Sequence, residues 1–311
     1  MRVLITGHTG FVGKHLAALV ADEGHAVSGL SLTTGCDIRD YEHVRELVEA
    51  YEPDEIHHLA AQAYVPEANT DPRRGFDVNL IGTLNLLEAV RHTGCRARVH
   101  IAGTSEEYGY DYGGSILNEA TACRPTSVYG VTKLAAGQLG LAYSRIYGIP
   151  VVHTRAFNHT GPGHQARYAI PSFARQIALA EQAVAEGRSR PPITHGNLHA
   201  VRDYTDVRDV VRAYRVAIRQ NPGVYNVCTS HTRSLSSILD GLISLSDTPM
   251  VAVPDEALYR PGMETGDAPL FYPQADKLIN AGWQPQIKWH RTLADILGYW
   301  RESLPTTKET T

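Results

Sequence analysis

Three glycines near the amino terminus, spaced three residues apart, constrain the fold of this chain more than any other feature. Gly7, Gly10 and Gly13 come directly after the apolar run Arg2–Thr6 and directly before the helical pattern Lys14–Val20. A strand, a glycine-rich turn and a helix in this order are typical of a dinucleotide-binding βαβ unit. Gly7 allows a tight turn, Gly10 lets the backbone approach a pyrophosphate, and Gly13 lets the helix pack closely on the strand. The helix amino terminus then offers free N–H groups to the anion.

Strand-like and helix-like segments alternate through the amino-terminal half. Short apolar, β-branched runs predict strands at His25–Leu32, Glu55–Leu59, Arg98–Ala102 and Val151–Arg155, and amphipathic runs predict helices at Tyr41–Tyr51 and Val78–His92. This alternation indicates parallel βαβ units, and hence an α/β fold with a Rossmann-type, doubly wound parallel sheet. Ligands of such sheets bind beyond the carboxyl ends of the strands. Thr104, Ser105 and Glu106 follow the fourth predicted strand and are therefore candidate site residues.

The alternation of predicted strands and helices becomes less regular in the carboxyl-terminal half, where Gly, Pro and long connections become frequent. We expect residues 1–157 to form mainly the dinucleotide-binding domain and residues 158–304 mainly a smaller, interleaved substrate-binding domain. The run Val224–Val227 is expected to return to the main sheet as a strand. The polar residues 305–311 are expected to form a disordered tail.

Composition argues against several classes of function. The chain has 311 residues, a net charge of -4 and no long basic run, which argues against nucleic acid or an anionic membrane surface as a partner. Its four cysteines are scattered without a C-x-x-C pair, and its 15 histidines show no metal-ligand spacing, so neither a disulfide framework nor a metal site is expected. No apolar run reaches bilayer-spanning length, and the first predicted strand leaves no room for a signal peptide. We therefore expect a cytoplasmic protein.

A tyrosine and a lysine four residues apart, Tyr129 and Lys133, form a candidate catalytic pair. On a helix, both side chains project from one face, one turn apart. A nearby ammonium favours phenolate, so we expect Lys133 to lower the pKa of Tyr129. Such a phenol suits proton transfer to or from an alcohol or a ketone near neutral pH. The pattern alone is weak, and its meaning depends on the nucleotide turn and on the residues at the strand ends.

The sequence leaves the choice between NAD and NADP open. An acidic residue at the end of the second strand would bind the ribose hydroxyls of NAD, and a nearby arginine would suit the 2′-phosphate of NADP. Here the strand runs into Ser31, Leu32, Thr33 and Thr34. Ser31 and Thr33 could serve either cofactor, and Asp37 is better placed to contact the adenine.

Taken together, these motifs resemble the extended short-chain dehydrogenase/reductase family that acts on nucleotide sugars, and the resemblance runs nearly end to end. The blocks that carry it are His58–Ala68, Asn79–Leu87, Phe157–Gly163, Arg202–Val207, Val224–Cys228 and Gly282–Pro285. Within the family, the chain is most similar to the reductases of GDP-4-keto-6-deoxy-mannose. The resemblance implies NADPH- or NADH-dependent reduction of the 4-keto group of an NDP-4-keto-6-deoxyhexose, with conversion of GDP-4-keto-6-deoxy-D-mannose to GDP-D-rhamnose as the first expectation. It also implies a homodimer formed through the helix Val78–His92 and the helix that carries Tyr129.

The same resemblance implies roles for individual residues. Tyr129 would donate a proton to the keto oxygen, Lys133 would hold the nicotinamide ribose, and Thr104 and Ser105 would orient the sugar. The residues expected to bind the cofactor are Gly7, Gly10, Phe11, Val12, Gly13, Asp37, Ile38, Leu59, Ala60, Ala61, Asn79, Tyr129 and Lys133. The residues expected to bind the substrate are Thr104, Ser105, Glu106, Asn158, Arg202 and Arg260.

Glu106 keeps a second reaction open. Sugar-nucleotide 4,6-dehydratases of this family use a threonine followed two residues later by a glutamate that removes the C5 proton, and Thr104 and Glu106 match that pattern. The blocks Asp203–Val207 and Val224–Cys228 follow the reductase pattern instead. We therefore expect a reductase, with a GDP-mannose-type 4,6-dehydratase as the alternative and an epimerase as a lesser one. A non-catalytic nucleotide sensor is disfavoured, because both residues of the tyrosine–lysine pair are present.

Overall fold

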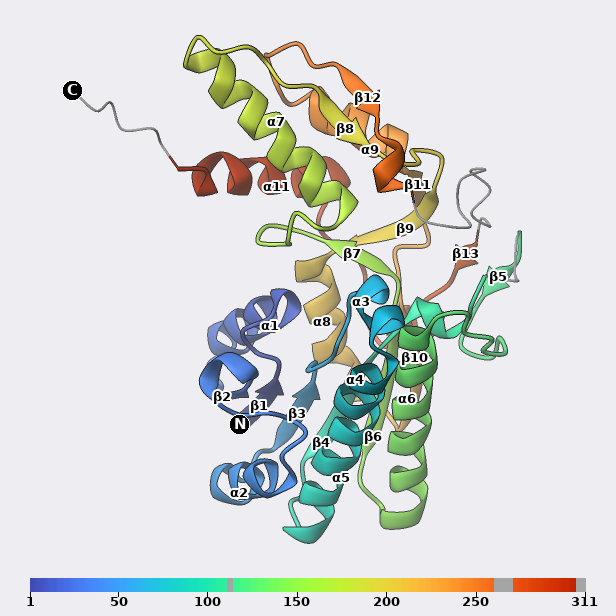
Figure 1. Ribbon diagram of the computed structural model, residues 1–311. Coiled ribbons are helices and arrows are strands. Elements are labelled where there is room, and N and C mark those ends of the chain that lie inside the picture. Colours follow the sequence, from blue (N-terminus) through green and yellow to red (C-terminus); the bar gives the residue numbers. More distant parts are fainter. Residues whose placement is uncertain (111–113, 260–270, 306–311) are drawn as a thin grey trace, which may run out of the picture.

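The protein, a computed structural model that describes residues 1–110, 114–259 and 271–305, is built around one parallel sheet (Figure 1). Within these residues the sheet has six strands in the order β2-β1-β3-β4-β6-β10, and each neighbouring pair is parallel. The strands are β1 (Arg2–Thr6), β2 (Ala26–Leu30), β3 (Glu55–His58), β4 (Arg98–Thr104), β6 (Val151–Ala156) and β10 (Gly223–Val227). The predicted α/β fold with a doubly wound parallel sheet is confirmed.

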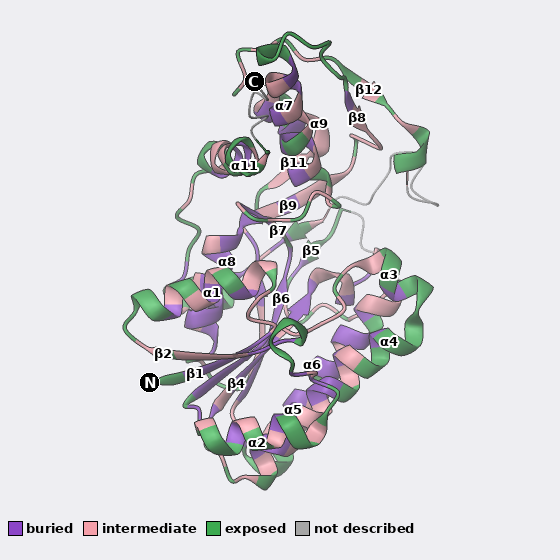
Figure 2. Ribbon diagram, turned by 60° about the vertical axis from the view of Figure 1, so that its left-hand side comes forward, coloured by how far each residue is buried: buried purple, intermediate pink, exposed green. Residues whose placement is uncertain are grey.

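Helices cover both faces of this sheet, and the strands between them are buried (Figure 2). Helices α1 (Phe11–Asp22) and α8 (Val207–Ala217) lie on one face, and α2 (Tyr41–Tyr51), α5 (Gly82–His92) and α6 (Val128–Tyr147) lie on the other. A strand covered on both faces has to be apolar along its whole length. Val3, Leu4 and Ile5 of β1 are accordingly all fully buried.

The order of the strands reverses at β1. From β1 the chain first forms β2 on one side, and then β3 on the other side of β1. The loops after β1 and β3 therefore lie side by side at the carboxyl edge of the sheet, which is where open α/β sheets bind their ligands. Gly7 follows β1, and Leu59–Ala61 follow β3.

A smaller group of elements lies beyond this edge, in the upper part of Figure 1. Helices α7 (Ala169–Ala185), α9 (Leu235–Ile243) and α11 (Trp289–Ser303) pack around a shared apolar core. Short strands line it: β7 (Asn158–Thr160) pairs with β9 (Val201–Asp206), β9 with β11 (Thr232–Ser234), and β8 (Ile193–His195) with β12 (Ala252–Pro254). After β9 the chain returns to the main sheet as α8 and β10, so the two groups are interleaved.

The remaining elements are short. They are η1 (Leu32–Thr34), α3 (Val65–Thr70), α4 (Pro72–Phe76), η2 (Asp77–Ile81), η3 (Ser105–Glu107), β5 (Ile116–Leu117), η4 (Glu256–Leu258), β13 (Tyr272–Pro273) and α10 (Asp276–Asn280). None of the described helices combines the length and the apolar character that crossing a bilayer requires. Arg260 and residues 306–311 of the expected tail lie outside the described residues.

Several boundaries differ from the predictions made from the sequence, and three of these differences concern the site. The second strand ends at Leu30 rather than Leu32, because residues 32–34 form the short η1 turn, in which the Ser31 N–H donates to Thr34 Oγ1 at 3.2 Å. The predicted helix Val78–His92 begins with a π-helical turn, η2, before α5 starts. π-Helical turns are often found at functional sites. Strand β4 continues to Thr104, so this residue ends the strand instead of following it.

Candidate active site

The glycine-rich turn has the geometry that a bound pyrophosphate requires. Gly7 has a φ of 72°, and a Cβ at this position would lie 2.9 Å from the backbone nitrogen of Ala60. A Cβ on Gly13 would lie 2.2 Å from the carbonyl oxygen of Gly7, so only glycine lets α1 pack this closely. Gly10 is the N-cap of α1, and no side chain caps this end of the helix. The first-turn N–H groups, including those of Phe11 and Val12, can therefore bind an anion, and the turn fits a dinucleotide.

Hydrogen bonds hold the loop after β3 beside this turn. Thr6 Oγ1 accepts from the backbone N–H groups of Leu59 at 3.2 Å and Ala60 at 3.0 Å. Asn79, buried in the π-helical turn, accepts from the Gln62 N–H at 2.8 Å and donates to Thr132 Oγ1 at 2.9 Å. Because Thr132 lies on α6, Asn79 joins the loop that contains Ala61 to the helix that carries the tyrosine–lysine pair.

Helix α6 carries Tyr129 and Lys133 at its amino-terminal end. Ser127 is its N-cap, and the Ser127 Oγ accepts from the Gly130 N–H at 3.0 Å. A Cβ on Gly130 would lie 2.6 Å from the carbonyl oxygen of Glu106, so the first turn of α6 packs directly on η3. This contact places the first turn of α6, which carries Tyr129, beside η3, which contains Ser105 and Glu106.

The pKa of Tyr129 is raised in this structure, whereas Lys133 was expected to lower it. Burial raises the pKa of Tyr129 above its ordinary value of 10.0, and nearby phenols and carboxylates raise it further. Burial also lowers the pKa of Lys133 to about 8, although Glu107 opposes this shift. Sequence spacing reveals that the two groups are neighbours, but it does not reveal how strongly burial penalises a phenolate.

The turn after β4 holds the two residues that could distinguish reduction from dehydration. Thr104 Oγ1 accepts from the Glu106 N–H at 3.3 Å. The Glu106 carboxylate accepts from the Tyr110 hydroxyl at 2.5 Å through Oε1, and from the Ser127 hydroxyl at 3.2 Å through Oε2. Both oxygens of Glu106 therefore have hydroxyl partners.

Glu107 is a structural residue of the site that the sequence analysis missed. It is fully buried, and its carboxylate accepts from the Thr104 N–H at 2.9 Å, from His153 Nε2 at 2.9 Å and from Arg155 Nε at 2.8 Å. Gly103 and Gly137 make room for this cluster, because a Cβ on either would come within 2.5 Å of the His153 ring. The signal in the sequence was a histidine and an arginine inside β6, a strand that is buried along its whole length.

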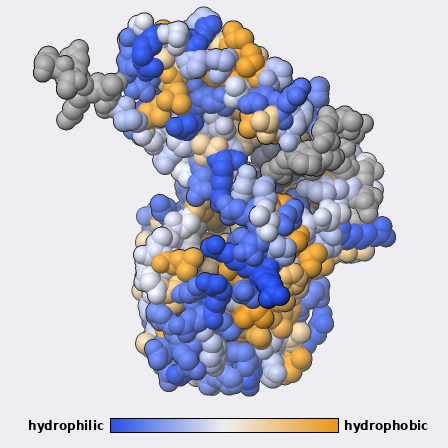
Figure 3. Space-filling model, viewed as in Figure 1, coloured by the Kyte–Doolittle hydropathy of each residue, from blue (hydrophilic) through white to orange (hydrophobic). Residues whose placement is uncertain are grey.

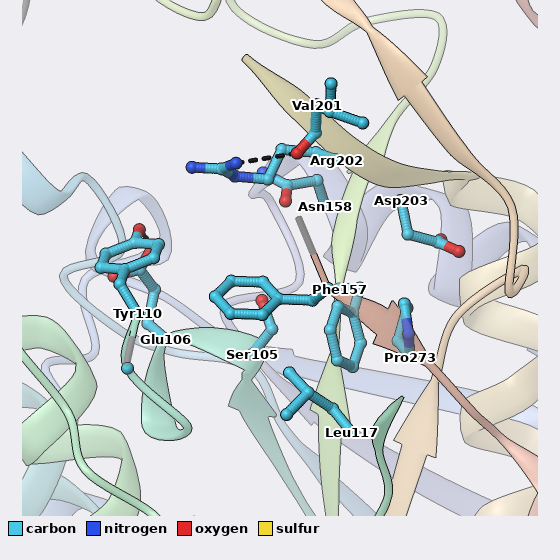
Figure 4. A pocket seen from close by; sticks show the side chains of 12 residues that line it. Ser105, Glu106, Tyr110, Leu117, Phe157, Asn158, Val201, Arg202, Asp203 and Pro273 are labelled. Atoms are coloured by element: carbon cyan, nitrogen blue, oxygen red, sulfur yellow. Dashed lines mark hydrogen bonds between the residues drawn. The ribbon is translucent and has the colours of Figure 1, made fainter. Parts of the chain in front are cut away.

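A pocket opens between this turn and the second group of elements (Figure 4). Its lining residues are Ser105, Glu106, Gly109, Tyr110, Leu117, Phe157, Asn158, Val201, Arg202, Asp203, Phe271 and Pro273. The Arg202 guanidinium lies 5.6 Å from the centre of the Tyr110 ring, and none of the described acidic side chains forms an ion pair with it. Arg202 is therefore a cation available to an anionic ligand.

Asp37 and Ile38 lie away from this pocket. Asp37 borders a separate hollow with Arg39, Asp40, Asp77 and Ile81. Its pKa is lowered, chiefly by a side-chain hydrogen bond from Arg39, a residue that the sequence analysis did not consider. The Ile38 side chain is buried against Gly82, so only its backbone could contact a cofactor.

Comparisons with known proteins agree with this geometry. Residues 3–228 match the NAD dependent epimerase/dehydratase family. GDP-6-deoxy-D-mannose reductase from Pseudomonas aeruginosa is 33% identical over 302 residues, which cover 96% of this chain and 97% of that one. The structure of RMD from P. aeruginosa complexed with NADPH has a TM-score of 0.86 at 31% identity and covers 97% of this chain and 99% of that one. GDP-mannose 4,6-dehydratase from Sinorhizobium fredii is 30% identical over 265 residues, which cover 76% of this chain and 74% of that one.

Proposed function

The chain belongs to the NAD dependent epimerase/dehydratase family, and we propose that it reduces the 4-keto group of an NDP-4-keto-6-deoxyhexose. The proposed reaction is the conversion of GDP-4-keto-6-deoxy-D-mannose to GDP-D-rhamnose at the expense of NADPH or NADH. One observation carries the proposal: GDP-6-deoxy-D-mannose reductase is 33% identical over 96% of this chain, whereas a dTDP-glucose 4,6-dehydratase that matches 92% of this chain is 28% identical.

In this proposal the carboxyl edge of the sheet binds the cofactor. A reduced nicotinamide, when bound, supplies the hydride that reaches C4 of the sugar. The uncapped start of α1, with Gly10, Phe11 and Val12, binds the pyrophosphate, and Lys133 holds the nicotinamide ribose. Asn79 fixes the loop after β3 against α6, which sets the distance between the cofactor and Tyr129.

Tyr129 is the proton donor in this mechanism. Its raised pKa keeps the phenol protonated at neutral pH, so the hydroxyl can hydrogen-bond to the keto oxygen of the substrate. As hydride reaches C4, negative charge develops on O4, and Tyr129 gives its proton to that oxygen. Thr104 and Ser105 hold the sugar beside it by hydrogen bonds.

The diphosphate of the substrate needs a cationic partner. We assign this role to Arg202, which lines the pocket without a carboxylate partner among the described residues, and Asn158 offers an amide beside it. Arg260, outside the described residues, is a second candidate from the sequence alone. An unpaired dianion is expensive to bury, so replacing Arg202 should weaken substrate binding more than turnover.

The end of β2 suits either dinucleotide. Ser31, Thr33 and Thr34 present hydroxyls there, and Thr33 Oγ1 donates to Thr9 Oγ1 of the glycine-rich turn at 2.8 Å. No carboxylate stands among these three residues to repel a 2′-phosphate. We therefore propose that both NADPH and NADH be tested as reductants.

The test is to mix the purified protein with GDP-4-keto-6-deoxy-D-mannose and follow the absorbance of NADPH or NADH. We expect one reduced dinucleotide to be consumed for each ketone, and a Tyr129→Phe protein that binds the cofactor but turns over far more slowly. Folded protein that consumes neither dinucleotide would overturn the proposal.

A 4,6-dehydratase is the second candidate, and Thr104 with Glu106 favours it. A dehydratase cycles its own cofactor, so GDP-mannose would lose water without an added reductant. Glu106→Gln should abolish that reaction, because the carboxylate would be the base, but should only reduce the rate of ketone reduction. Dehydration of GDP-mannose by the parent protein, without added reductant, would establish the 4,6-dehydratase function.

We also propose a cytoplasmic homodimer. Apolar side chains gather over α5 and α6 in Figure 3, and Phe76, Ile81 and Val131 are exposed in α4, η2 and α6. A second copy of the chain, packing the same helices against this face, would cover them. Sedimentation should give a dimer for the parent and a monomer for Val131→Asp; a parent that sediments as a monomer would rule the dimer out.

A further inference from the structure

We propose that Tyr110 is a specificity-determining residue: its hydroxyl restrains the Glu106 carboxylate and so prevents this group from removing the C5 proton of the 4-keto substrate. The inference rests on the proposed reductase function. It explains how a chain with a dehydratase-type threonine and glutamate, Thr104 and Glu106, can avoid removing the C5 proton, which is the step that this glutamate performs in a dehydratase.

Hydrogen bonds reach the Glu106 carboxylate from two sides. The Tyr110 hydroxyl donates to Oε1 at 2.5 Å, and the Ser127 hydroxyl donates to Oε2 at 3.2 Å. Ser127 is itself fixed as the N-cap of α6, because its Oγ accepts from the Gly130 N–H at 3.0 Å. The carboxylate is therefore held between the turn after β4 and the start of the helix that carries the proton donor.

The Tyr110 ring is also held in place. It stacks on Phe271 with ring centres 6.2 Å apart and an interplanar angle of 22°, and the Arg202 guanidinium lies 5.6 Å from its centre. Figure 4 shows Tyr110 and Glu106 together on one side of the pocket, with Arg202 directed toward them. A phenol ring fixed by these two neighbours loses little further freedom when its hydroxyl donates to Glu106.

The chemistry that this contact opposes is enolisation. A 4-keto group acidifies the C5–H bond; when this bond breaks, the proton passes to a Glu106 oxygen and the electron pair spreads over C5, C4 and O4 as an enolate. Return of a proton to C5 completes an exchange, or inverts C5 if it arrives on the other face. In a reductase this is a side reaction that consumes or scrambles the substrate.

Restraint by Tyr110 makes this side reaction slower in two ways. A carboxylate oxygen that accepts the phenolic hydrogen bond is a weaker base toward the C5 proton, because the bond stabilises the charged form of Glu106. The bond also fixes the direction of the carboxylate, so Glu106 cannot turn toward C5 without breaking it. Each effect disappears when the hydroxyl of Tyr110 is removed, while the ring and its stacking remain.

The experiment measures deuterium exchange at C5. Parent and Tyr110→Phe proteins are incubated in D₂O with GDP-4-keto-6-deoxy-D-mannose and NADP⁺, which prevents reduction, and C5 deuteration is followed by NMR. We expect exchange to be at least about 10-fold faster in Tyr110→Phe, as loss of a hydrogen bond to a charged group allows. Adding Glu106→Gln to that variant should return the exchange rate to the parent level.

Tyr108→Phe is the matched control. It removes a hydroxyl from the same turn, but the Tyr108 hydroxyl is bonded to Asn118 and Asn226 rather than to Glu106. Each of three results would overturn the proposal. The exchange rate could be unchanged in Tyr110→Phe, or the faster exchange could persist in the double variant. Tyr108→Phe could also accelerate exchange as much as Tyr110→Phe does. Should Tyr110→Phe fail to fold, Tyr110→Leu is expected to show the same acceleration. NADPH consumption by the parent is measured separately, so failure of the reductase function is recognised independently.

Discussion

The buried carboxylate of Glu107 leads to the sharpest stability prediction. Replacing Glu107 with Gln keeps the shape of the side chain but removes its charge from a fully buried cluster. Arg155 would then lack a counterion, and the new amide group would face the Nε–H of Arg155 or the Nε2 proton of His153. Two hydrogen-bond donors, the new NH₂ group and the N–H of Arg155 or His153, would then face each other in a buried cluster.

The magnitude follows from the three contacts. Glu107 accepts from Arg155 Nε at 2.8 Å, from His153 Nε2 at 2.9 Å and from the Thr104 N–H at 2.9 Å. Removing one partner of a buried ion pair costs about 3–5 kcal/mol, because the other charge stays buried. Gln retains one acceptor for the Thr104 N–H, so we expect the lower end, about 3 kcal/mol.

The assay is urea-induced unfolding of the parent, Glu107→Gln and Glu106→Gln. Glu106 is the matched control, because it adjoins Glu107 in the chain but its carboxylate, among the described residues, accepts hydrogen bonds only from hydroxyls; we expect a loss of at most about 1 kcal/mol there. Burial raises the pKa of Glu107, but His153, Arg155 and the Thr104 N–H together bring it below its ordinary value of 4.5. The stabilisation should thus be complete above pH 5 and lost as the pH falls through the folded-state pKa. Equal stability of Glu107→Gln and the parent at pH 7 would refute this reasoning.

Three further predictions concern the cofactor and the proton donor. Tyr129→Phe should lower kcat for ketone reduction by about 10²–10⁴-fold without a matching loss of NADPH affinity, measured by steady-state kinetics and fluorescence titration. Burial lowers the pKa of Lys133 to about 8, so kcat/KM for NADPH should fall as the pH rises through about 8, and Lys133→Met should lack this limb of the profile. Gly13→Ala should weaken NADPH binding by at least about 10-fold, because its Cβ would lie 2.2 Å from the Gly7 carbonyl oxygen. Gly298→Ala, with no heavy atom within 4 Å of its Cβ, should bind NADPH as the parent does.

The parts of the fold that follow from local patterns could be predicted from the sequence. Glycine spacing after an apolar run located the turn at Gly7–Gly13, and alternating strand and helix patterns indicated the parallel sheet. The pair Tyr129 and Lys133 was found because helical spacing places them on one face. These features depend on residues that are close in sequence.

Features that depend on burial or on distant contacts could not be predicted in the same way. Of two adjacent glutamates, only the fold shows that Glu107 is buried, because its partners His153 and Arg155 lie on another strand. The raised pKa of Tyr129 likewise results from packing by several elements. The bond from Tyr110 to Glu106 depends on how the turn after β4 folds back on itself.

Transfer of a labelled hydride distinguishes ketone reduction from dehydration. NADPH that carries deuterium at the transferable position of its nicotinamide is mixed with the protein and GDP-4-keto-6-deoxy-D-mannose, and the sugar product is examined by NMR. We expect deuterium at C4 of a 6-deoxyhexose, one atom for each NADPH consumed, with strongly reduced transfer by Tyr129→Phe. Deuterium that stays in the dinucleotide, while the same protein removes water from GDP-mannose without added reductant, would contradict the account.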